Sequence, residues 1–329
     1  MDKNFRKLLR QREEISVRYD PDTATIWCYF NPKIRPCYTM KMLQEAHELQ
    51  LSIIDYFKMH DMKPKVPIRY YVMASLTPEV YNYGGDLNLF SKLIINQDRE
   101  TLHAYAKICI DIVYLNAVNF NLPITTISLV KGTALGGGFE GALSCNILIA
   151  EENTKMGLPE IRFNLFPGMG AYSFLARSIG IKNAEEMIKN GKVYDAQTLY
   201  EKGVITILAK PNEGEKELEK FIKKHSKVFN GMQAITSVRH RYNPIEHSEL
   251  MDITEIWVDA ALRLEPKDLK VMQKLVEVQD FKSNGTIIKT RTKQDRRISQ
   301  KPTIYPLFDN GGNQIFEDRR SGADRRLCI

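Results

Sequence analysis

Two glutamates, Glu140 and Glu160, lie twenty residues apart, and each follows a segment rich in glycine or proline. Glu140 comes two positions after the triple glycine at 136–138, and Glu160 follows Leu158-Pro159. Glycine lets a backbone approach a ligand closely, and N–H groups at the start of a helix favour negative charge. Two carboxylates beside such donors can remove one proton and deliver another next to an oxyanion.

The segments that must position these glutamates alternate between strand-like and helix-like patterns. Two short strands joined by a turn at Pro21-Asp22 are expected within 18–30. Apolar runs predict further strands, and helical spacing predicts helices, in the ranges that follow. The strands are 66–75, 124–130, 146–150 and 204–209; the helices are 40–60, 87–119 (one helix or two), 136–145, 168–180, 183–191 and 195–203, with Asp195 as an N-cap. Such alternation, without a nucleotide fingerprint, predicts an α/β core.

The chain changes character after this core. It is predicted almost wholly helical from 213 to 282. From residue 281 onward there are 11 Lys/Arg against 5 Asp/Glu, so this end supplies six of the seven net positive charges. It repeats an acid-Arg-Arg unit at 318–320 and 324–326, and 287–293 could be a strand. We predict a core at 1–209, a helical region at 210–282 and a basic extension at 283–329, which is an ordered appendix, a docking peptide or a solvated tail.

Composition narrows the functional class. With 43% hydrophobic and 26% charged residues, the chain has the composition of a soluble globular protein. Its apolar runs fall short of the ~20 residues that span a membrane, and the start has no signal-peptide pattern. Five cysteines without CxxC spacing indicate neither a disulfide frame nor a zinc site. We expect a cytoplasmic protein that is not membrane-embedded and, since its first 280 residues are nearly neutral, has no nucleic-acid partner.

Other chemistries fit the sequence poorly. The glycine run at 132–138 lacks both the Gly-Lys-Ser/Thr ending of a phosphate loop and dinucleotide spacing. No serine lies in a GxSxG elbow. Cys145 lies in an apolar run typical of a packed core thiol. Three histidines on polar helical stretches, His225, His240 and His247, are expected at the surface.

Four segments of the chain resemble the crotonase (enoyl-CoA hydratase/isomerase) superfamily. More narrowly, they are similar to its diffusible-signal-factor synthases, which make cis-2-unsaturated fatty acid signals in bacteria. The segments are 81–90, 132–145, 157–172 and 253–259; they occur in the right order, and the resemblance spans roughly residues 15 to 280. It implies an α/β fold with a crotonase-like core of repeated ββα units, followed by a helical trimerisation region.

The resemblance also implies the roles of individual residues. The N–H donors for a thioester oxyanion fall on Gly85 and Gly137, one from each glycine loop, and losing one such donor typically costs ~10²–10³ in rate. Glu140 and Glu160 divide the proton transfers at the α carbon and the hydroxyl, and the sequence leaves open which is acid and which is base. Candidate pocket residues next to these motifs are Leu135, Gly136, Phe166, Met169, Gly170 and Trp257. For Trp257, core or subunit packing is the alternative.

The leading hypothesis is a dehydratase and thioesterase that makes a cis-2-unsaturated fatty acid signal. Its substrate would be a 3-hydroxyacyl thioester on acyl carrier protein or CoA, with no other cofactor. The alternatives are an enoyl-CoA hydratase of fatty-acid metabolism, or a regulatory protein that binds a sensor histidine kinase. The resemblance implies a homotrimer or a dimer of trimers. Acyl chain length and double-bond geometry stay open.

Overall fold

The computed structural model describes residues 3–60, 67–283, 307–308 and 314–315, and it contains a large central sheet. Strands β1 and β2 are antiparallel, and every later neighbour in this sheet is parallel. The six strands, in spatial order, are β1 (Ile15–Asp20), β2 (Thr25–Phe30), β3 (Tyr70–Ser75), β5 (Thr125–Val130), β7 (Ile147–Glu151) and β10 (Ile207–Ala209). All of the strands expected from the sequence in this region are confirmed.

A second, smaller sheet was not anticipated. It has the order β4 (Val80–Asn82), β6 (Thr133–Leu135), β8 (Lys155–Gly157) and β9 (Val193–Asp195). Each strand has only three residues, which is too short to show a period of two in the sequence. The pairs β3/β4, β5/β6 and β7/β8 each place one strand in the large sheet and the next in the small sheet. This is the repeated ββα arrangement that the resemblance implied, and the predicted fold class is confirmed.

The small sheet brings the chemical motifs to one edge. Strands β4, β6 and β8 are parallel, so their carboxyl ends lie on the same side. Residues 84–85 follow β4, residues 136–137 follow β6, and Glu160 comes three residues after β8. Segments up to 76 residues apart in sequence therefore converge because three short strands end together.

The expected helices of the core are present. The range 87–119 forms two helices, and a short N-terminal helix is additional. Asp195 caps its helix by accepting the Thr198 N–H at 2.8 Å, as predicted. The helices are α1 (Lys3–Leu8), α2 (Met40–Met59), α3 (Leu87–Ile95), α4 (Arg99–Ala117), α5 (Gly137–Leu143), α6 (Ala171–Ile179), α7 (Ile181–Asn190) and α8 (Ala196–Glu201), with 3₁₀ turns at Asn119–Asn121, Pro159–Phe163 and Ser226–Val228.

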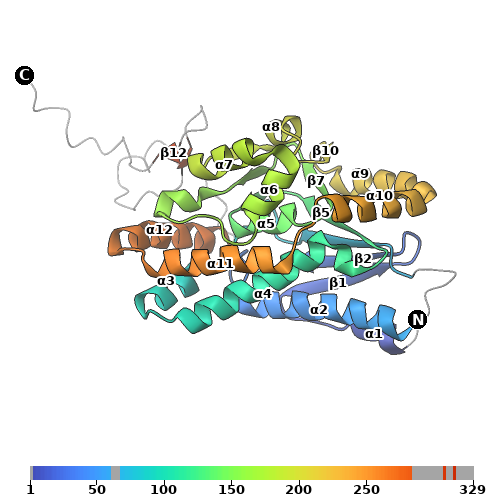
Figure 1. The fold of residues 1–329 in the computed structure, drawn as a ribbon, viewed down its shortest axis with the longest axis horizontal. Helices are drawn as coiled ribbons and strands as arrows, with labels where there is room; N and C mark the ends of the chain where they lie inside the picture. Colours follow the sequence, from blue (N-terminus) through green and yellow to red (C-terminus); the bar gives the residue numbers. More distant parts are fainter. Residues whose placement is uncertain (1–2, 61–66, 284–306, 309–313, 316–329) are drawn as a thin grey trace, which may run out of the picture.

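The predicted helical region follows β10 as α9 (Gly214–His225), α10 (Phe229–Tyr242), α11 (His247–Leu262) and α12 (Pro266–Ser283). Helix α9 covers one face of the large sheet, and α2, α4 and α5 pack on the other. Helix α11 lies alongside α4, and α12 packs against α3 (Figure 1). The strand expected at 287–293 and the acid-Arg-Arg units lie outside the described residues. Within the described part of the chain, no helix is both long enough and apolar enough to cross a membrane.

The expectation that His225 lies at the surface is wrong. Its side chain is buried, and its Nδ1 lies 3.0 Å from the Tyr70 hydroxyl of β3. The rings of Phe221 and Phe229 also pack against it. Helix α9 carries His225 on the face that covers the sheet, and the polar residues around it in sequence occupy the opposite face.

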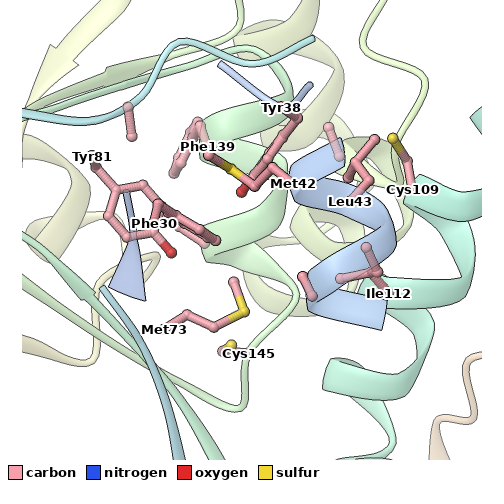
Figure 2. Packing of buried hydrophobic residues seen from close by; sticks show 14 of the residues in the cluster. Phe30, Tyr38, Met42, Leu43, Met73, Tyr81, Cys109, Ile112, Phe139 and Cys145 are labelled. Atoms are coloured by element: carbon pink, nitrogen blue, oxygen red, sulfur yellow. The ribbon is translucent and has the colours of Figure 1, made fainter. Parts of the chain in front are cut away.

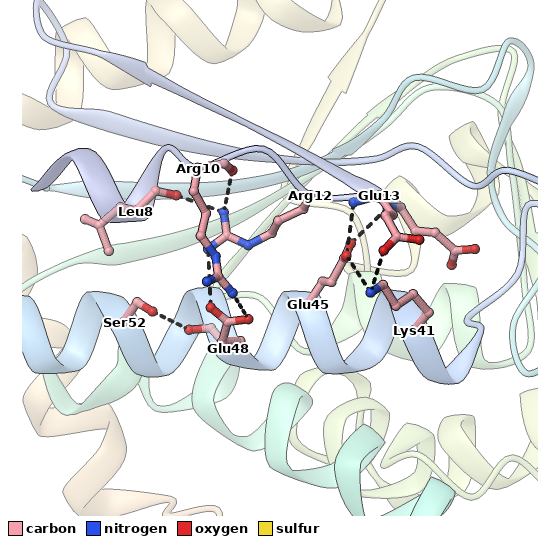
Figure 3. A network of polar contacts seen from close by, with 9 residues as sticks. Leu8, Arg10, Arg12, Glu13, Lys41, Glu45, Glu48 and Ser52 are labelled. Atoms are coloured by element: carbon pink, nitrogen blue, oxygen red, sulfur yellow. Dashed lines mark hydrogen bonds and ion pairs between the residues drawn. The ribbon is translucent and has the colours of Figure 1, made fainter.

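The segment before β1 is tied to α2 by polar contacts (Figure 3). The Glu45 carboxylate accepts the N–H groups of Glu13 at 3.0 Å and Glu14 at 2.9 Å. One turn further along α2, Glu48 pairs with Arg10. These bonds hold the N-terminal segment against the helix and fix where β1 enters the sheet.

Candidate active site

The two glycine loops at the edge of the small sheet touch each other. A Cβ atom built on Gly84 would lie 2.8 Å from the Gly137 nitrogen. A Cβ atom on Gly137 would lie 3.4 Å from the Gly85 nitrogen. Among the described residues, neither the Gly85 nor the Gly137 N–H has a hydrogen-bond acceptor. Two adjacent backbone donors of this kind can stabilise an oxyanion, and they lie at the two positions that the resemblance implied.

The first glycine loop is held by residues that sequence reasoning missed. The Asn82 Oδ1 accepts the Gly84 N–H at 2.7 Å, and the Tyr38 N–H donates to the Gly84 carbonyl at 2.7 Å. The Tyr105 hydroxyl donates in turn to the Tyr38 carbonyl. Asn82 belongs to a motif segment and could have been noted. Tyr38 and Tyr105 come from distant loops and helices, so nothing in the sequence signals their meeting with the loop.

Glu140 lies on α5 and is 1% exposed. Its Oε1 accepts the N–H groups of Met169 at 2.7 Å and Ala171 at 3.0 Å. Both donors can point at one oxygen because Gly170 between them has φ +103°, a conformation that glycine adopts without strain. Burial raises the pKa of Glu140 to about 7, and the two N–H donors counter that rise. Glu140 is therefore poised to exchange a proton near neutral pH.

Glu160 faces the same edge from the 3₁₀ turn after β8. Its Oε1 lies 2.3 Å from where a Cβ atom on Gly136 would be. Its Oε2 is buried and has no hydrogen-bond partner among the described residues. Burial, and secondly the negative charge of Glu140, raise the pKa of Glu160 well above its usual range. Its burial, its unpaired oxygen and the nearby negative charge all favour the protonated form of Glu160.

The contrast between the two carboxyls indicates distinct roles. Glu140 has backbone donors that stabilise its anion, whereas Glu160 has an unpaired oxygen and a negative neighbour. In such a pair the proton resides on the less stabilised group. The geometry thus favours Glu140 as the base and Glu160 as the acid when a water molecule is added.

Some of the pocket candidates lie beside the glutamates and the glycine loops. Met169, Gly136 and Gly170 lie beside the two glutamates, and the Met169 sulfur lies 2.7 Å from the Cβ position of Gly137. Leu135 ends β6, and its carbonyl oxygen lies 2.9 Å from the Cβ position of Gly84.

The other two pocket candidates, Trp257 and Phe166, lie apart from the glutamates and the glycine loops. The Trp257 ring on α11 packs over the backbone of Gly168 and against the Phe90 ring, with ring centroids 5.4 Å apart. Phe166 is half-buried at the margin of the main apolar core. Neither residue lines the apolar cavity that borders Met169. Trp257 thus makes the core contact weighed as the alternative, and a substrate contact for either residue stays a prediction.

The fold and the sequence have known relatives. The sequence model of the enoyl-CoA hydratase/isomerase family matches residues 49–250. The mitochondrial methylglutaconyl-CoA hydratase of Mus musculus is 32% identical over 155 residues, which are 47% of this chain and 47% of that protein. The chain thus matches about half the length of such curated relatives.

Solved structures share the overall architecture. The enoyl-CoA hydratase of Bacillus halodurans superposes with a TM-score of 0.66 at 17% identity, covering 80% of this chain and all of that one. Pseudomonas aeruginosa DspI superposes with a TM-score of 0.55 at 20% identity, covering 82% of this chain and 97% of that one. At such low sequence identities, these superpositions show a shared fold and nothing more specific.

Proposed function

Because the chain belongs to the enoyl-CoA hydratase/isomerase family, we propose that it adds water to, or removes water from, an acyl thioester at carbons 2 and 3. One observation carries the proposal: two buried carboxyls of different acidity face the edge where the free Gly85 and Gly137 N–H groups meet. The chemistry requires those three elements, namely a base, an acid and an oxyanion site.

In the hydration direction, Glu140 takes a proton from water as the water oxygen bonds to carbon 3. The electron pair of the double bond moves toward the thioester, and the negative charge gathers on the carbonyl oxygen. The Gly85 and Gly137 N–H groups donate hydrogen bonds to that oxygen, and the helix dipole at the N-terminus of α5 further stabilises its negative charge. Glu160 then gives its proton to carbon 2. Dehydration runs through the same steps in reverse.

The finer proposal is synthesis of a cis-2-unsaturated fatty acid from a 3-hydroxyacyl thioester on acyl carrier protein. It is supported by the four motif segments, which resemble the diffusible-signal-factor synthases. After dehydration, water would attack the thioester carbonyl while Glu140 removes its proton. The same N–H pair would hold the oxyanion, the C–S bond would break, and the thiol would leave with a proton from Glu160.

Analysis of products by mass spectrometry tests both levels of the proposal. The purified chain is mixed with 3-hydroxydodecanoyl-carrier protein, 3-hydroxydodecanoyl-CoA or trans-2-enoyl-CoA, beside Glu140→Gln and Glu160→Gln variants. A free cis-2-enoic acid, absent with the variants, supports the synthase. Reversible hydration of CoA thioesters without release of a free acid supports the hydratase function and rules out the synthase function. Turnover that survives both substitutions overturns the mechanism.

A homotrimer is the assembly we propose, with α10 contributing to its interface. Ile235, Val238 and Tyr242 on α10 are spaced by three and four residues and are 63%, 66% and 89% exposed, and Val228, which is 56% exposed, directly precedes the helix. Such spacing puts apolar side chains on one helix face, as in helix–helix interfaces. A dimer of trimers and a sensor-kinase partner for the extension at 283–329 stay predictions.

A further inference from the structure

The Gly85 N–H belongs to the same peptide group as the Gly84 carbonyl. In a trans peptide these two groups point in opposite directions within one plane, so a bond that fixes the carbonyl also fixes the direction of the N–H. The Gly84 carbonyl accepts the Tyr38 N–H at 2.7 Å. The direction of this proposed oxyanion donor is therefore set by the position of the Tyr38 backbone.

The Tyr38 backbone is held in turn by Tyr105 of α4. The Tyr105 hydroxyl donates to the Tyr38 carbonyl. The same hydroxyl accepts the Asp86 N–H at 3.4 Å. That N–H belongs to the peptide group between Gly85 and Asp86, on the other side of the Gly85 α-carbon. One hydroxyl therefore constrains both peptide groups that flank this α-carbon, the first through Tyr38 and the second directly.

Packing fixes the position of the Tyr105 ring. The side chain is buried, and it meets the Phe90 ring of α3 edge-on, with ring centroids 4.9 Å apart. The Phe90 ring also lies against Gly85, because a Cβ atom there would be 2.5 Å from it. Burial raises the pKa of Tyr105 well above its usual range, so the hydroxyl keeps the proton that it donates. The hydroxyl is thus a fixed point beside the first glycine loop.

The Tyr38 side chain ties the same loop to α5, the helix that carries the second donor. Figure 2 shows this side chain within the apolar cluster that also contains Phe30, Met42 and Phe139. Its hydroxyl lies against the α5 backbone, 2.3 Å from where a Cβ atom on Gly141 would be. Tyr38 therefore links the first glycine loop to the helix that begins at Gly137, and Tyr105 holds the backbone of Tyr38 in place.

We propose that Tyr105 is a positioning residue of the oxyanion site, whose hydroxyl holds the Gly85 N–H in the direction and at the spacing from the Gly137 N–H that a thioester oxyanion requires. Tyr105 acts through Tyr38 and Asp86, and not on the substrate itself. Donors that are fixed in advance need no reorganisation as charge develops, so freedom at Gly85 costs rate. The inference rests on the proposed function, since it gives Tyr105 a role in binding a thioester oxygen.

The test removes one hydroxyl and keeps the ring. Tyr105→Phe retains the contact with Phe90 and loses both hydrogen bonds of the hydroxyl. The matched control is Tyr70→Phe, because Tyr70 is also buried and its hydroxyl lies 3.0 Å from the Nδ1 of His225, on the face of the large sheet that α9 covers. A third variant carries 4-aminophenylalanine at position 105, which restores a donor there. Thermal unfolding confirms that each variant folds.

We expect Tyr105→Phe to lower kcat by about 10–100-fold, because the donor is still present but is no longer held in place. KM should stay nearly the same, as for the loss of an interaction made in the transition state. Tyr70→Phe should lower the Tm and leave kcat unchanged, and 4-aminophenylalanine should recover part of the lost kcat. A wild-type kcat in Tyr105→Phe, or an equal fall in Tyr70→Phe, overturns the proposal.

An infrared measurement separates this proposal from the proposed function. The probe is a ketone analogue of octanoyl-CoA with a ¹³C-labelled carbonyl, in which a methylene group replaces the sulfur. It has no double bond to hydrate and no thioester to hydrolyse. Hydrogen bonds to the bound carbonyl lower its stretching frequency, so the frequency should rise in Tyr105→Phe and not in Tyr70→Phe.

The two proposals can then fail separately. If no thioester is turned over, the proposed function fails, and a higher carbonyl frequency in Tyr105→Phe alone still supports the positioning role. If wild type, Tyr105→Phe and Tyr70→Phe give the same frequency, the positioning role fails whatever the activity.

Discussion

A Cβ atom on Gly136 would lie 2.3 Å from the Oε1 of Glu160, so this carboxyl occupies the space that any side chain at position 136 would need. Gly136 also has φ +52° and precedes Gly137, the proposed oxyanion donor. The glycine therefore serves two purposes, since it turns the backbone and leaves room for the carboxyl.

The first prediction is that Gly136→Ala displaces Glu160 and lowers kcat by about 100-fold, the order expected for a misplacement near 1 Å. Gly203→Ala is the matched control, because Gly203 has φ +79° and nothing within 4 Å of its Cβ position. Both variants should lose about 1–2 kcal/mol of unfolding free energy to backbone strain. Steady-state kinetics and chemical denaturation measure the two effects. Equal kcat in both variants would refute the steric argument.

The second prediction concerns the pH dependence of hydration. Hydration requires Glu140 ionised and Glu160 protonated. Because the pKa of Glu140 is raised to about 7, kcat/KM should rise about tenfold per pH unit below that value. It should fall at higher pH as Glu160, whose pKa is raised well above its usual range, loses its proton. The two limbs belong to the coupled pair. A profile that is flat between pH 5 and pH 7 would contradict the assignment of Glu140.

The third prediction is that Glu160→Gln abolishes turnover while stabilising the fold in alkaline solution. The folded-state pKa of Glu160 is raised, so its contribution to stability is fully present below its unfolded value of 4.5 and is lost as pH rises through the folded value. Glutamine does not ionise, so the variant does not lose this stability as the pH rises. The Tm of the variant should match wild type near pH 4.5 and exceed it by a few degrees at pH 8.5. Calorimetry over this range checks the sign, and Glu152→Gln on the surface is the control. A Tm difference that does not grow with pH would refute it.

The fourth prediction concerns assembly. Replacing two exposed residues of α10, Ile235→Lys with Val238→Lys, should lower the molar mass in light scattering from a trimer toward a monomer. Two charges in an apolar interface oppose association. Leu51→Lys, an exposed apolar position on α2, serves as control. An unchanged trimer would exclude this face of α10 from the interface.

The sequence by itself determined the fold class and the identity of the chemical groups. The 3.6-residue spacing in α2 and α4 and the apolar runs of β3 and β5 are local patterns, which one segment displays alone. Glycine and proline beside Glu140 and Glu160 are also local, and so the carboxyls and the glycine loops could be named in advance.

Only the tertiary structure decided how those groups meet and what surrounds them. The three-residue strands β4, β6 and β8 have too few residues to leave a pattern, yet their common edge places Gly85, Gly137 and Glu160 together. The burial of His225, the packing of Trp257 on Gly168 and the bond from Tyr105 to Tyr38 each depend on distant segments. The pKa shifts of the two carboxyls likewise depend on the folded chain: burial raises both, the donors Met169 and Ala171 lower that of Glu140, and the charge of Glu140 raises that of Glu160. These are long-range effects of packing and electrostatics, and they exist only once the chain has folded.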